Sequence, residues 1–224
     1  MAREDGATGR FAREAVLFDF DGTLVDTGPS VIRCARHALA ERGWDPDGVG
    51  ELRLLIGPPL RDGFRLVTGA DDAEVDALVD AYRAFFDRAV TPADYPPFPG
   101  MPELMRALSA AGRRVGIATS RLEDRARAMA AAARLPRVDV LAGRVEPDRM
   151  TKAEAVVACL DQLGLAPGDA VMVGDRRNDV EGAHEAGVPC VGVWRDEPAR
   201  AELVEAGADA LCRDAGELAA LLGV

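Results

Sequence analysis

Short apolar runs alternate with longer amphipathic stretches along most of the chain. The short runs cover residues 15–20, 114–119, 138–142, 170–174 and 189–193. Each has the length of a strand that is buried on both faces of a sheet. Between them, residues 101–111 and 153–163 carry leucines and valines at helical spacing, and each stretch is followed by a glycine that can end a helix. This alternation predicts βαβ units around a parallel sheet.

The alternation is interrupted between about residues 27 and 95. Helical patterns occur there at 31–42 and 74–89, without a clear strand. Residues 91–99 then contain four prolines, a density that favours a stiff, extended connector. We therefore expect a helical insertion after the first strand, closed by a rigid linker.

Composition narrows the classes of partner. The 224 residues include 38 Asp and Glu against 27 Lys and Arg, which gives a net charge of −11. Such an acidic chain lacks the positive surface that attracts phosphate backbones and anionic lipids. No apolar stretch approaches the roughly 18 residues of a membrane span, and residues 1–14 lack the apolar segment of a signal peptide. We expect no nucleic acid, no membrane and a cytoplasmic location, where the four scattered cysteines stay reduced.

The first apolar run leads into the sequence DFDGT at 19–23. Ligands of parallel α/β sheets bind beyond the C-terminal ends of the strands. Asp19 and Asp21 are two residues apart, so an extended backbone would point both carboxylates to one side. Gly22 lets the chain turn sharply and expose amide groups. Two such carboxylates suit a divalent cation, with one also free as a nucleophile or acid–base group, although a plain Asp-Gly turn has the same letters.

Three further polar features follow later elements. Thr119 and Ser120 end the second run, where they can hold a phosphate oxygen or cap a helix. Lys152 begins a helix after a polar loop, a place where most lysines are simply solvated. The sequence GDRRND carries Asp175 and Asp179, which can bind a cation or cap their own loop. Each feature is ambiguous alone, so the interpretation depends on their joint order.

Taken in order, these features resemble the haloacid dehalogenase superfamily of phosphatases. The insertion resembles the helical cap of its phosphoglycolate-phosphatase-like branch. The segments that carry the resemblance are DFDGTLVDT (19–27), IGPPL (56–60), FPG (98–100), GIATS (116–120), TKAEAV (151–156) and GDRRNDVEGA (174–183). The resemblance implies an α/β fold with a Rossmann-like parallel-sheet core, helices on both of its faces and an inserted α-helical cap domain. The core would comprise residues 12–26 and 97–224, and the cap residues 27–96.

The resemblance also implies a Mg2+-dependent phosphatase that acts on a small phosphomonoester, with phosphoglycolate as the first candidate. Asp19 would attack phosphorus and form an aspartyl-phosphate, and Asp21 would serve as general acid and then as general base. The carboxylates of Asp19 and Asp175 and the main-chain carbonyl of Asp21 would hold Mg2+. Asp179 would orient these groups from outside the metal's own ligand shell.

The same resemblance assigns the substrate-binding groups. Thr119 and the amides near Gly22 and Ser120 would hold phosphoryl oxygens, while Lys152 would offset the charge that gathers there. Closure of the cap would bring the turn before Arg61 over the substrate. Arg61 is then the candidate for recognising the rest of the substrate, for example a carboxylate. A solvated arginine on a helix surface is the equal alternative.

Two other functions remain open on these residues. A phosphomutase of the β-phosphoglucomutase type would return the phosphoryl group to a sugar instead of water. A phosphate-binding protein without turnover would keep the site but lose the reaction. A dehalogenase fits less well, because Asp21, Gly22 and the acidic GDRRND loop suit a metal–phosphate reaction. In each case the expected partner is a small phosphorylated metabolite, and the protein itself is a monomer or a homodimer.

Overall fold

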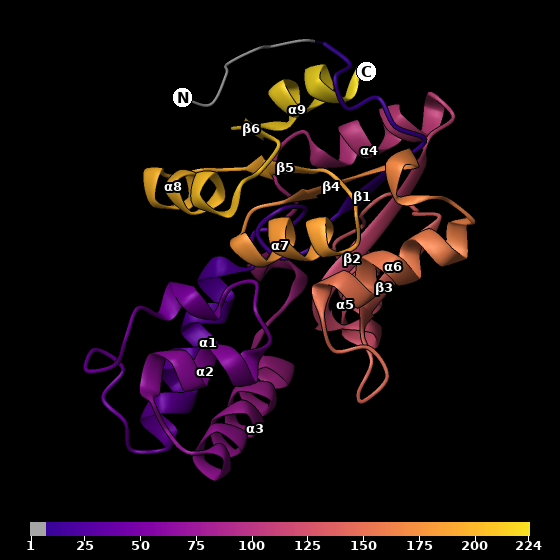
Figure 1. Ribbon diagram of the computed structural model, residues 1–224. Helices are drawn as coiled ribbons and strands as arrows, with labels where there is room; N and C mark the ends of the chain where they lie inside the picture. The colour runs from indigo at the N-terminus through magenta and orange to yellow at the C-terminus, as the bar shows by residue number, and fades with distance from the viewer. Residues whose placement is uncertain (1–7) are drawn as a thin grey trace.

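The computed structural model describes residues 8–224 as an α/β fold around one sheet (Figure 1). All neighbouring strands are parallel, and their order is β3-β2-β1-β4-β5-β6. The strands are β1 (Ala15–Phe18), β2 (Arg114–Leu122), β3 (Val140–Arg144), β4 (Ala170–Gly174), β5 (Cys190–Val193) and β6 (Ala210–Cys212). The order reverses between β1 and β4, and ligands of Rossmann-type sheets bind beside such a reversal.

Helices cover both faces of the sheet. Val16 and Phe18 of β1 belong to an apolar cluster with residues of α4 (Met101–Ala110), α5 (Glu123–Ala132) and α9 (Ala215–Leu222). Ala15 and Leu17 belong to a second cluster with residues of α6 (Lys152–Leu163), α7 (Arg177–Glu185) and α8 (Glu197–Ala206). Neighbouring side chains of a strand point to opposite faces, so a strand covered on both sides reads as an unbroken apolar run. The predicted parallel core with helices on both faces is confirmed.

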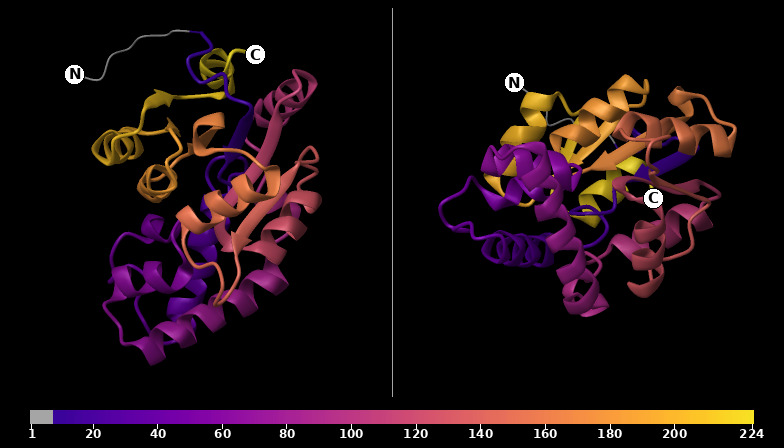
Figure 2. Two further views of the ribbon diagram at one scale, coloured as in Figure 1. Left: turned by 45° about the vertical axis from the view of Figure 1, so that its right-hand side comes forward. Right: turned by 90° about the horizontal axis from the view of Figure 1, so that it is seen from below.

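The interruption of the alternation corresponds to three helices inserted between β1 and β2. They are α1 (Gly28–Glu41), α2 (Leu60–Thr68) and α3 (Asp72–Ala89). We call these helices, together with the residues between them, the cap. Figures 1 and 2 show the cap packed as one group, on the opposite side of the molecule from α9 and the C-terminus. Phe64 and Tyr82 are buried inside it, with their rings edge to face at 6.2 Å. The residue boundaries 27 and 96 stay a prediction.

Two neighbouring segments of chain join the cap to the core. The Asp26 N–H donates to the Pro96 carbonyl, and the Phe98 N–H donates to the Leu24 carbonyl, both at 2.9 Å. These bonds make a short antiparallel ribbon, with Val25 opposite Pro97. The cap is therefore attached through one narrow hydrogen-bonded connection, at the edge of the sheet where the strands end.

The structure contains elements that the apolar pattern did not predict. They are α2, α5, α7, α8, α9 and β6, together with a β2 that continues to Leu122 instead of ending at residue 119. The extension of β2 carries polar residues, which the search for apolar runs excluded. Within residues 8–224 no helix combines the length and the apolar character that crossing a membrane needs.

Candidate active site

Three carboxylates meet where β1 and β4 end. Asp19 follows β1, while Asp175 and Asp179 lie after β4, in the loop and in the first turn of α7. One carboxylate oxygen from each lies within 4.8 Å of the others. The Lys152 ammonium lies 2.6 Å from Asp19 Oδ1 and 2.7 Å from Asp179 Oδ1, and it also donates to the Ala118 carbonyl at 3.1 Å. Lys152 thus bridges two of the three carboxylates, and Arg176 Nε lies 3.7 Å from Asp175 Oδ2 of the third, so the carboxylates outnumber these two cations.

Local capping places two of these groups. Thr151 precedes α6, and its hydroxyl accepts the Glu154 N–H at 3.1 Å while the Glu154 carboxylate accepts the Thr151 N–H at 2.8 Å. This reciprocal capping box fixes where α6 begins, and so sets Lys152 as its first residue. Asp179 Oδ2 accepts the N–H groups of Asp175 and Arg176, both at 3.0 Å. Asp179 thus holds the loop that carries Asp175.

Burial and mutual repulsion make this cluster costly when it is ionised. Burial and the neighbouring Asp179 raise the pKa of Asp175 to about 7. Burial, with Asp179 next, also raises the pKa of Asp19 well above its usual value, although Lys152 acts against the shift. Burial disfavours the charged form of Lys152, but Asp179 and Asp19 outweigh it and raise the Lys152 pKa. The carboxylate forms of this site therefore call for more positive charge than Lys152 alone supplies.

The residues present fit a hard divalent cation. The cluster offers carboxylate oxygens, with no histidine or cysteine in it, and oxygen ligands are those that Mg2+ prefers while zinc favours nitrogen and sulfur. Its excess negative charge is what such a cation would relieve. Asp19 and Asp175 would hold the ion, together with the main-chain carbonyl of Asp21.

Gly22 and Thr23 shape the space around Asp175. Gly22 has φ +81°, and a Cβ on it would lie 2.2 Å from Asp175 Oδ2, so a side chain cannot fit there. The Thr23 hydroxyl donates to Asp175 Oδ1 at 3.1 Å. The Gly22 N–H itself donates to the Val25 carbonyl at 2.9 Å. The structure thus shows Gly22 making room for Asp175, and its predicted part in phosphoryl binding stays a prediction.

Asp21 is held by an arginine that sequence reasoning did not single out. Arg121 donates from Nε to Asp21 Oδ2 at 2.9 Å and from Nη2 to Oδ1 at 2.5 Å. Burial alone would raise the pKa of Asp21, but the Arg121 guanidinium outweighs it and the pKa is lowered. The available signal was position, because Arg121 follows Thr119 and Ser120 at the C-terminal end of β2, where ligands of parallel sheets bind.

The hydroxyl residues at the end of β2 lie at the same edge of the sheet. Thr119 is buried, and its Oγ1 accepts the Arg121 N–H at 3.2 Å. Ser120 Oγ accepts a hydrogen bond from Asn178 Nδ2 of α7 at 3.3 Å. The β2 end is thereby tied to the loop that follows β4. Contacts of Thr119 and Ser120 with phosphoryl oxygens stay a prediction.

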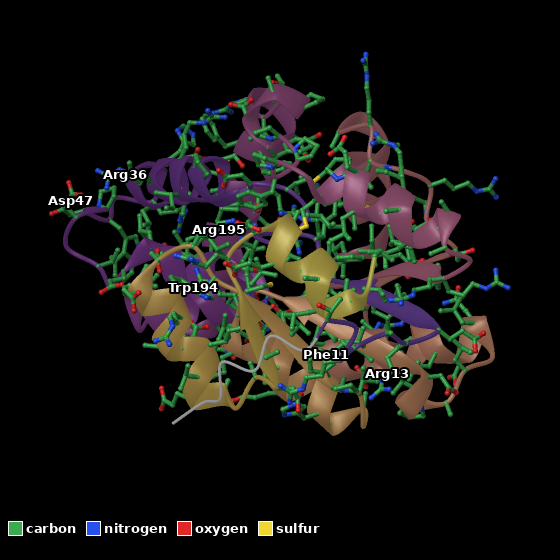
Figure 3. All side chains as sticks on the ribbon, turned by 90° about the horizontal axis from the view of Figure 1, so that it is seen from above. Phe11, Arg13, Arg36, Asp47, Trp194 and Arg195 are labelled. Atoms are coloured by element: carbon green, nitrogen blue, oxygen red, sulfur yellow. The ribbon has the colours of Figure 1, made fainter. Side chains whose placement is uncertain are left out.

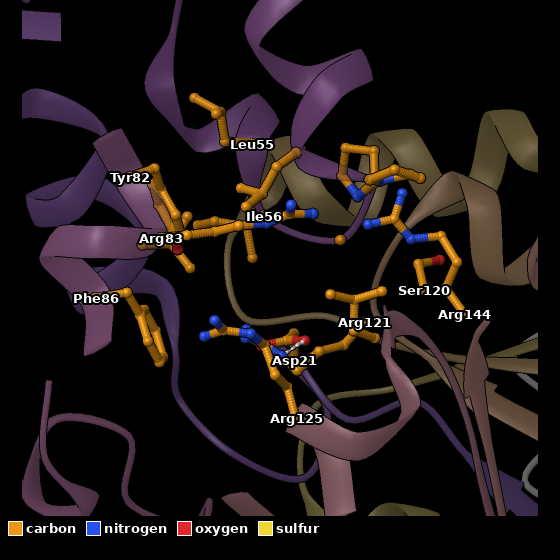
Figure 4. Close-up of a pocket in the computed structure, with 16 residues that line it drawn as sticks. Asp21, Leu55, Ile56, Tyr82, Arg83, Phe86, Ser120, Arg121, Arg125 and Arg144 are labelled. Atoms are coloured by element: carbon orange, nitrogen blue, oxygen red, sulfur yellow. Dashed lines mark hydrogen bonds and ion pairs between the residues drawn. The ribbon is translucent and has the colours of Figure 1, made fainter. Parts of the chain in front are cut away.

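A pocket lies between the cap and the ends of the strands (Figure 4). Core residues and cap residues both line it. Its lining residues are Asp21, Val31, Leu55, Ile56, Gly57, Pro58, Pro59, Leu60, Tyr82, Arg83, Phe86, Ser120, Arg121, Leu122, Arg125 and Arg144. Asp21 is thus open to a molecule bound beneath the cap, and the arginines around it were not identified from the sequence.

Arg61 lies apart from this pocket. It belongs to the first turn of α2, and its Nε lies 2.7 Å from Asp76 Oδ1 of α3. A second nitrogen, Nη2, lies 3.8 Å from Asp72 Oδ1. The structure places Arg61 in a link between two cap helices, and its predicted role in substrate recognition stays a prediction.

Arg195, which is labelled in Figure 3, reaches the DFDGT loop from the β4 side of the sheet reversal. It follows β5, and its Nη1 donates to the Gly22 carbonyl at 2.6 Å. Its guanidinium carbon lies 3.4 Å from the centre of the Phe98 ring, in the segment that returns from the cap. Arg195 lies in the loop between β5 and α8. The structure shows that this loop supports the turn at Gly22.

Comparisons with known proteins give matches over most of the chain. The sequence profile of the haloacid dehalogenase-like hydrolases matches residues 16–193. A 5'-nucleotidase of Pseudomonas aeruginosa is 36% identical over 180 residues, which are 80% of this chain and 81% of that protein. A phosphoglycolate phosphatase of Caulobacter vibrioides is 32% identical, over 82% of this chain and 81% of the other. The solved structure of Protein Tyrosine Kinase A from Mycobacterium tuberculosis superposes with a TM-score of 0.76 and 31% identity, over 95% of this chain and 99% of that one.

Proposed function

The chain belongs to the haloacid dehalogenase-like hydrolase family and is a phosphatase, and we propose that it hydrolyses a small phosphomonoester with Mg2+ through an aspartyl-phosphate on Asp19. The observation that carries the proposal is the setting of Asp19. This carboxylate lies at the end of β1, beside Lys152 and within the carboxylate cluster. Phosphoryl transfer needs positioning and positive charge more than elaborate covalent chemistry, and this site offers both.

In the first step, an Asp19 oxygen attacks phosphorus and the bond from phosphorus to the alcohol oxygen breaks. Lys152 offsets the charge on the phosphoryl oxygens, which Thr119 and the amide of Ser120 hold in place. Asp21 gives a proton to the departing alcohol. Asp19, Asp175 and the Asp21 carbonyl would hold Mg2+, which would supply further positive charge near the reacting phosphoryl group.

In the second step, water attacks the phosphorus of the aspartyl-phosphate and Asp21 accepts its proton. Orthophosphate leaves and the Asp19 carboxylate is restored. Two hydrogen bonds from Arg121 hold the Asp21 carboxylate and favour its ionised form. That form accepts the proton of water in this step, whereas Asp21 has to take up a proton before it can serve as the acid of the first step. Asp179 contributes by holding the Asp175 loop, through the two N–H groups that it accepts.

The names of the relatives give two substrates to test first, a nucleoside 5'-phosphate and phosphoglycolate. A phosphomutase would share Asp19 and the first step, but would pass the phosphoryl group to a second hydroxyl. Steady release of orthophosphate without an added bisphosphate supports the phosphatase. Rapid isomerisation of a sugar phosphate with little orthophosphate release would instead support the mutase.

Asp19→Asn is the test of this mechanism. The amide has nearly the same shape but is a poor nucleophile. Orthophosphate release from a phosphomonoester panel should therefore fall to background, while the variant still unfolds cooperatively on heating. Asp161→Asn is the matched control, because Asp161 is exposed on α6 and belongs neither to the carboxylate cluster nor to the lining of the pocket. Substantial turnover by Asp19→Asn would contradict the nucleophile. A wild-type protein that hydrolyses none of the panel would support binding without turnover.

A further inference from the structure

The pocket beneath the cap gathers positive charge on an acidic chain. Arg83, Arg121, Arg125 and Arg144 line it, and Asp21 is the one acidic residue among its 16 lining residues. The whole chain carries a net charge of −11. Lys152, the cation beside Asp19, is not part of this lining. The arginines therefore surround the space that the rest of the substrate would occupy.

Most of these guanidinium groups have a protein partner. Arg121 donates two hydrogen bonds to the Asp21 carboxylate. Arg125 donates to both carboxylate oxygens of Asp87, at 2.5 and 2.9 Å. Arg83 forms no ion pair with any residue of the described range 8–224. Arg144 is less completely paired than Arg121 and Arg125, because its only ion-pair partner in that range is Glu146, which is exposed.

Arg144 differs from the others in being both buried and incompletely satisfied. It is the last residue of β3, and only 9% of its side chain is exposed. Nη1 lies 3.1 Å from Glu146 Oε1, whereas Nε is buried and has no hydrogen-bond partner within residues 8–224. A buried donor without a partner costs free energy. Because Arg144 lines the pocket, an oxyanion bound there can accept hydrogen bonds from its guanidinium group.

Figure 4 places Arg144 with Ser120 on one side of the pocket and Tyr82 with Phe86 on the other. The two aromatic side chains are 3% and 8% exposed, so they offer little ring surface on which a nucleobase could stack. The polar groups that do face the pocket are guanidinium groups, whose planar fork matches carboxylate and phosphate oxygens.

We propose that Arg144 binds an anionic group on the alcohol portion of the substrate, so that the preferred substrates are phosphomonoesters with a second anionic group. This inference rests on the proposed phosphatase function. The second group is a carboxylate or another phosphate, which share the oxyanion chemistry that the Arg144 guanidinium group recognises. Arg144 thereby acts as the specificity residue of the core, and the cap closes the other side of the pocket.

Binding to the Asp19→Asn protein tests the inference without turnover. Calorimetry in the presence of Mg2+ would compare 2-hydroxyethyl phosphate, 2-phosphoglycolate and ethane-1,2-diol bisphosphate. These probes have similar size but carry a hydroxyl, a carboxylate or a second phosphate on the alcohol portion. We call 2-phosphoglycolate and the bisphosphate the charged probes, and 2-hydroxyethyl phosphate, whose alcohol portion is uncharged, the neutral probe. We expect the affinity for the charged probes to be at least about tenfold higher than the affinity for the neutral probe. The stronger of the two charged probes identifies the second anionic group.

Substitutions of Arg144 locate the effect. In the Asp19→Asn background, Arg144→Met should remove most of the preference for charged probes. The dissociation constant of the neutral probe should stay within about threefold of its value in Asp19→Asn alone. Arg144→Lys should restore part of it, since the charge returns without the fork. Arg127→Met is the matched control, because Arg127 is exposed on α5 and does not line the pocket. Should Arg144→Met fold poorly, Glu146→Gln offers the opposite test, as it frees Arg144 and should tighten binding of charged probes.

Four outcomes overturn the inference: equal affinity for charged and neutral probes, no measurable binding of the charged ones, a preference that survives Arg144→Met, or one that disappears with Arg61→Met instead. Failure of the phosphatase proposal looks different. In that case the wild-type protein releases no orthophosphate from any probe, whereas selective binding of charged probes to the Asp19→Asn protein persists.

Discussion

At the scale of single residues, the site is a set of charges that depend on one another. Lys152 bridges Asp19 and Asp179, Asp179 holds the loop of Asp175, and Arg121 holds Asp21. Each contact joins residues from different elements. Because burial weakens the screening of these charges, removal of one group alters the protonation of the others. The proton on Asp175 is the clearest case.

We predict that stabilisation by Mg2+ grows with pH. Burial and Asp179 raise the pKa of Asp175 to about 7. Without metal, the folded protein keeps a proton there that an unfolded chain loses near pH 4. The contribution of this carboxyl to stability is thus present below about pH 4 and is lost as the pH rises through about 7. Mg2+ must displace the proton, so the rise in melting temperature caused by Mg2+, measured by calorimetry, should be small near pH 5 and larger above pH 7.

The control for this prediction is Asp175→Asn, which removes both the titrating group and a metal ligand. Its melting temperature should respond weakly to Mg2+ at every pH. Phosphatase activity should in parallel be lost in excess chelator and return when Mg2+ is added to the wild-type protein. A Mg2+ effect of the same size at pH 5 and pH 8 would contradict the assignment of the proton to Asp175.

The carboxylates of the site could be predicted from the sequence because each follows a recognisable strand. Asp19 and Asp175 end apolar runs, and parallel strands bring their C-terminal ends to one edge. Arg121 and Arg144 could not be predicted in the same way. Their partners are set by tertiary packing, as with the 100-residue separation between Arg121 and Asp21, and an isolated arginine in a sequence reads as solvated surface.

At the scale of elements, the turn after β1 has to fit against the loop after β4. Gly22 meets this requirement through its positive φ and its missing side chain. Thr23 adds a hydrogen bond to Asp175, and Arg195 binds the Gly22 carbonyl. The DFDGT segment is thus a packing motif as well as a source of carboxylates, since its glycine lies where the two loops touch.

We predict that Gly22→Ala destroys the metal site, whereas Gly112→Ala does not. The two glycines have nearly the same φ, +81° and +79°, so both substitutions incur a conformational cost of about 1–2 kcal/mol. A Cβ on Gly112 meets nothing within 4 Å, but a Cβ on Gly22 lies 2.2 Å from Asp175 Oδ2. Stability should therefore fall in both variants, while kcat and the response of the melting temperature to Mg2+ should collapse in Gly22→Ala alone. Full activity of Gly22→Ala would refute this account of the glycine.

Elements with a clear apolar signature were predictable, and those held mainly by other interactions were not. The predicted helix at 153–163 corresponds to α6, which begins one residue earlier because of the Thr151 capping box. α5 buries little more than Ala126 and Met129, so its helical period is faint in the sequence. β6 is three residues long and lies at the edge of the sheet. Its position depends on pairing with β5, and a three-residue segment of sequence is too short to predict that pairing.

At the scale of the whole molecule, the pocket exists only where the cap meets the core. The insertion itself was predictable, because the break in strand–helix alternation marks it. The contacts that hold it over the site were not. Arg176, beside Asp175, donates to the Arg53 carbonyl of the cap at 3.2 Å, and Arg125 of α5 pairs with Asp87 of α3. With one narrow ribbon as the covalent link, such contacts decide how long the cap stays closed.

We predict that Asp87→Asn makes the cap open more often. The Arg125–Asp87 pair joins core to cap at an exposed position, where an ion pair contributes up to about 1 kcal/mol, so the open population should rise by up to about fivefold. Hydrogen exchange of the pocket-facing segments 55–60 and 119–125 should accelerate accordingly, and KM should rise more than kcat changes. Asp80→Asn, on the exposed face of the same helix and without an ion pair in residues 8–224, should match the wild type. Salt screens exposed ion pairs, so the difference in exchange rate between Asp87→Asn and wild type should shrink near 1 M salt. A difference that persists at 1 M salt, or no difference at low salt, would mean that other contacts hold the cap.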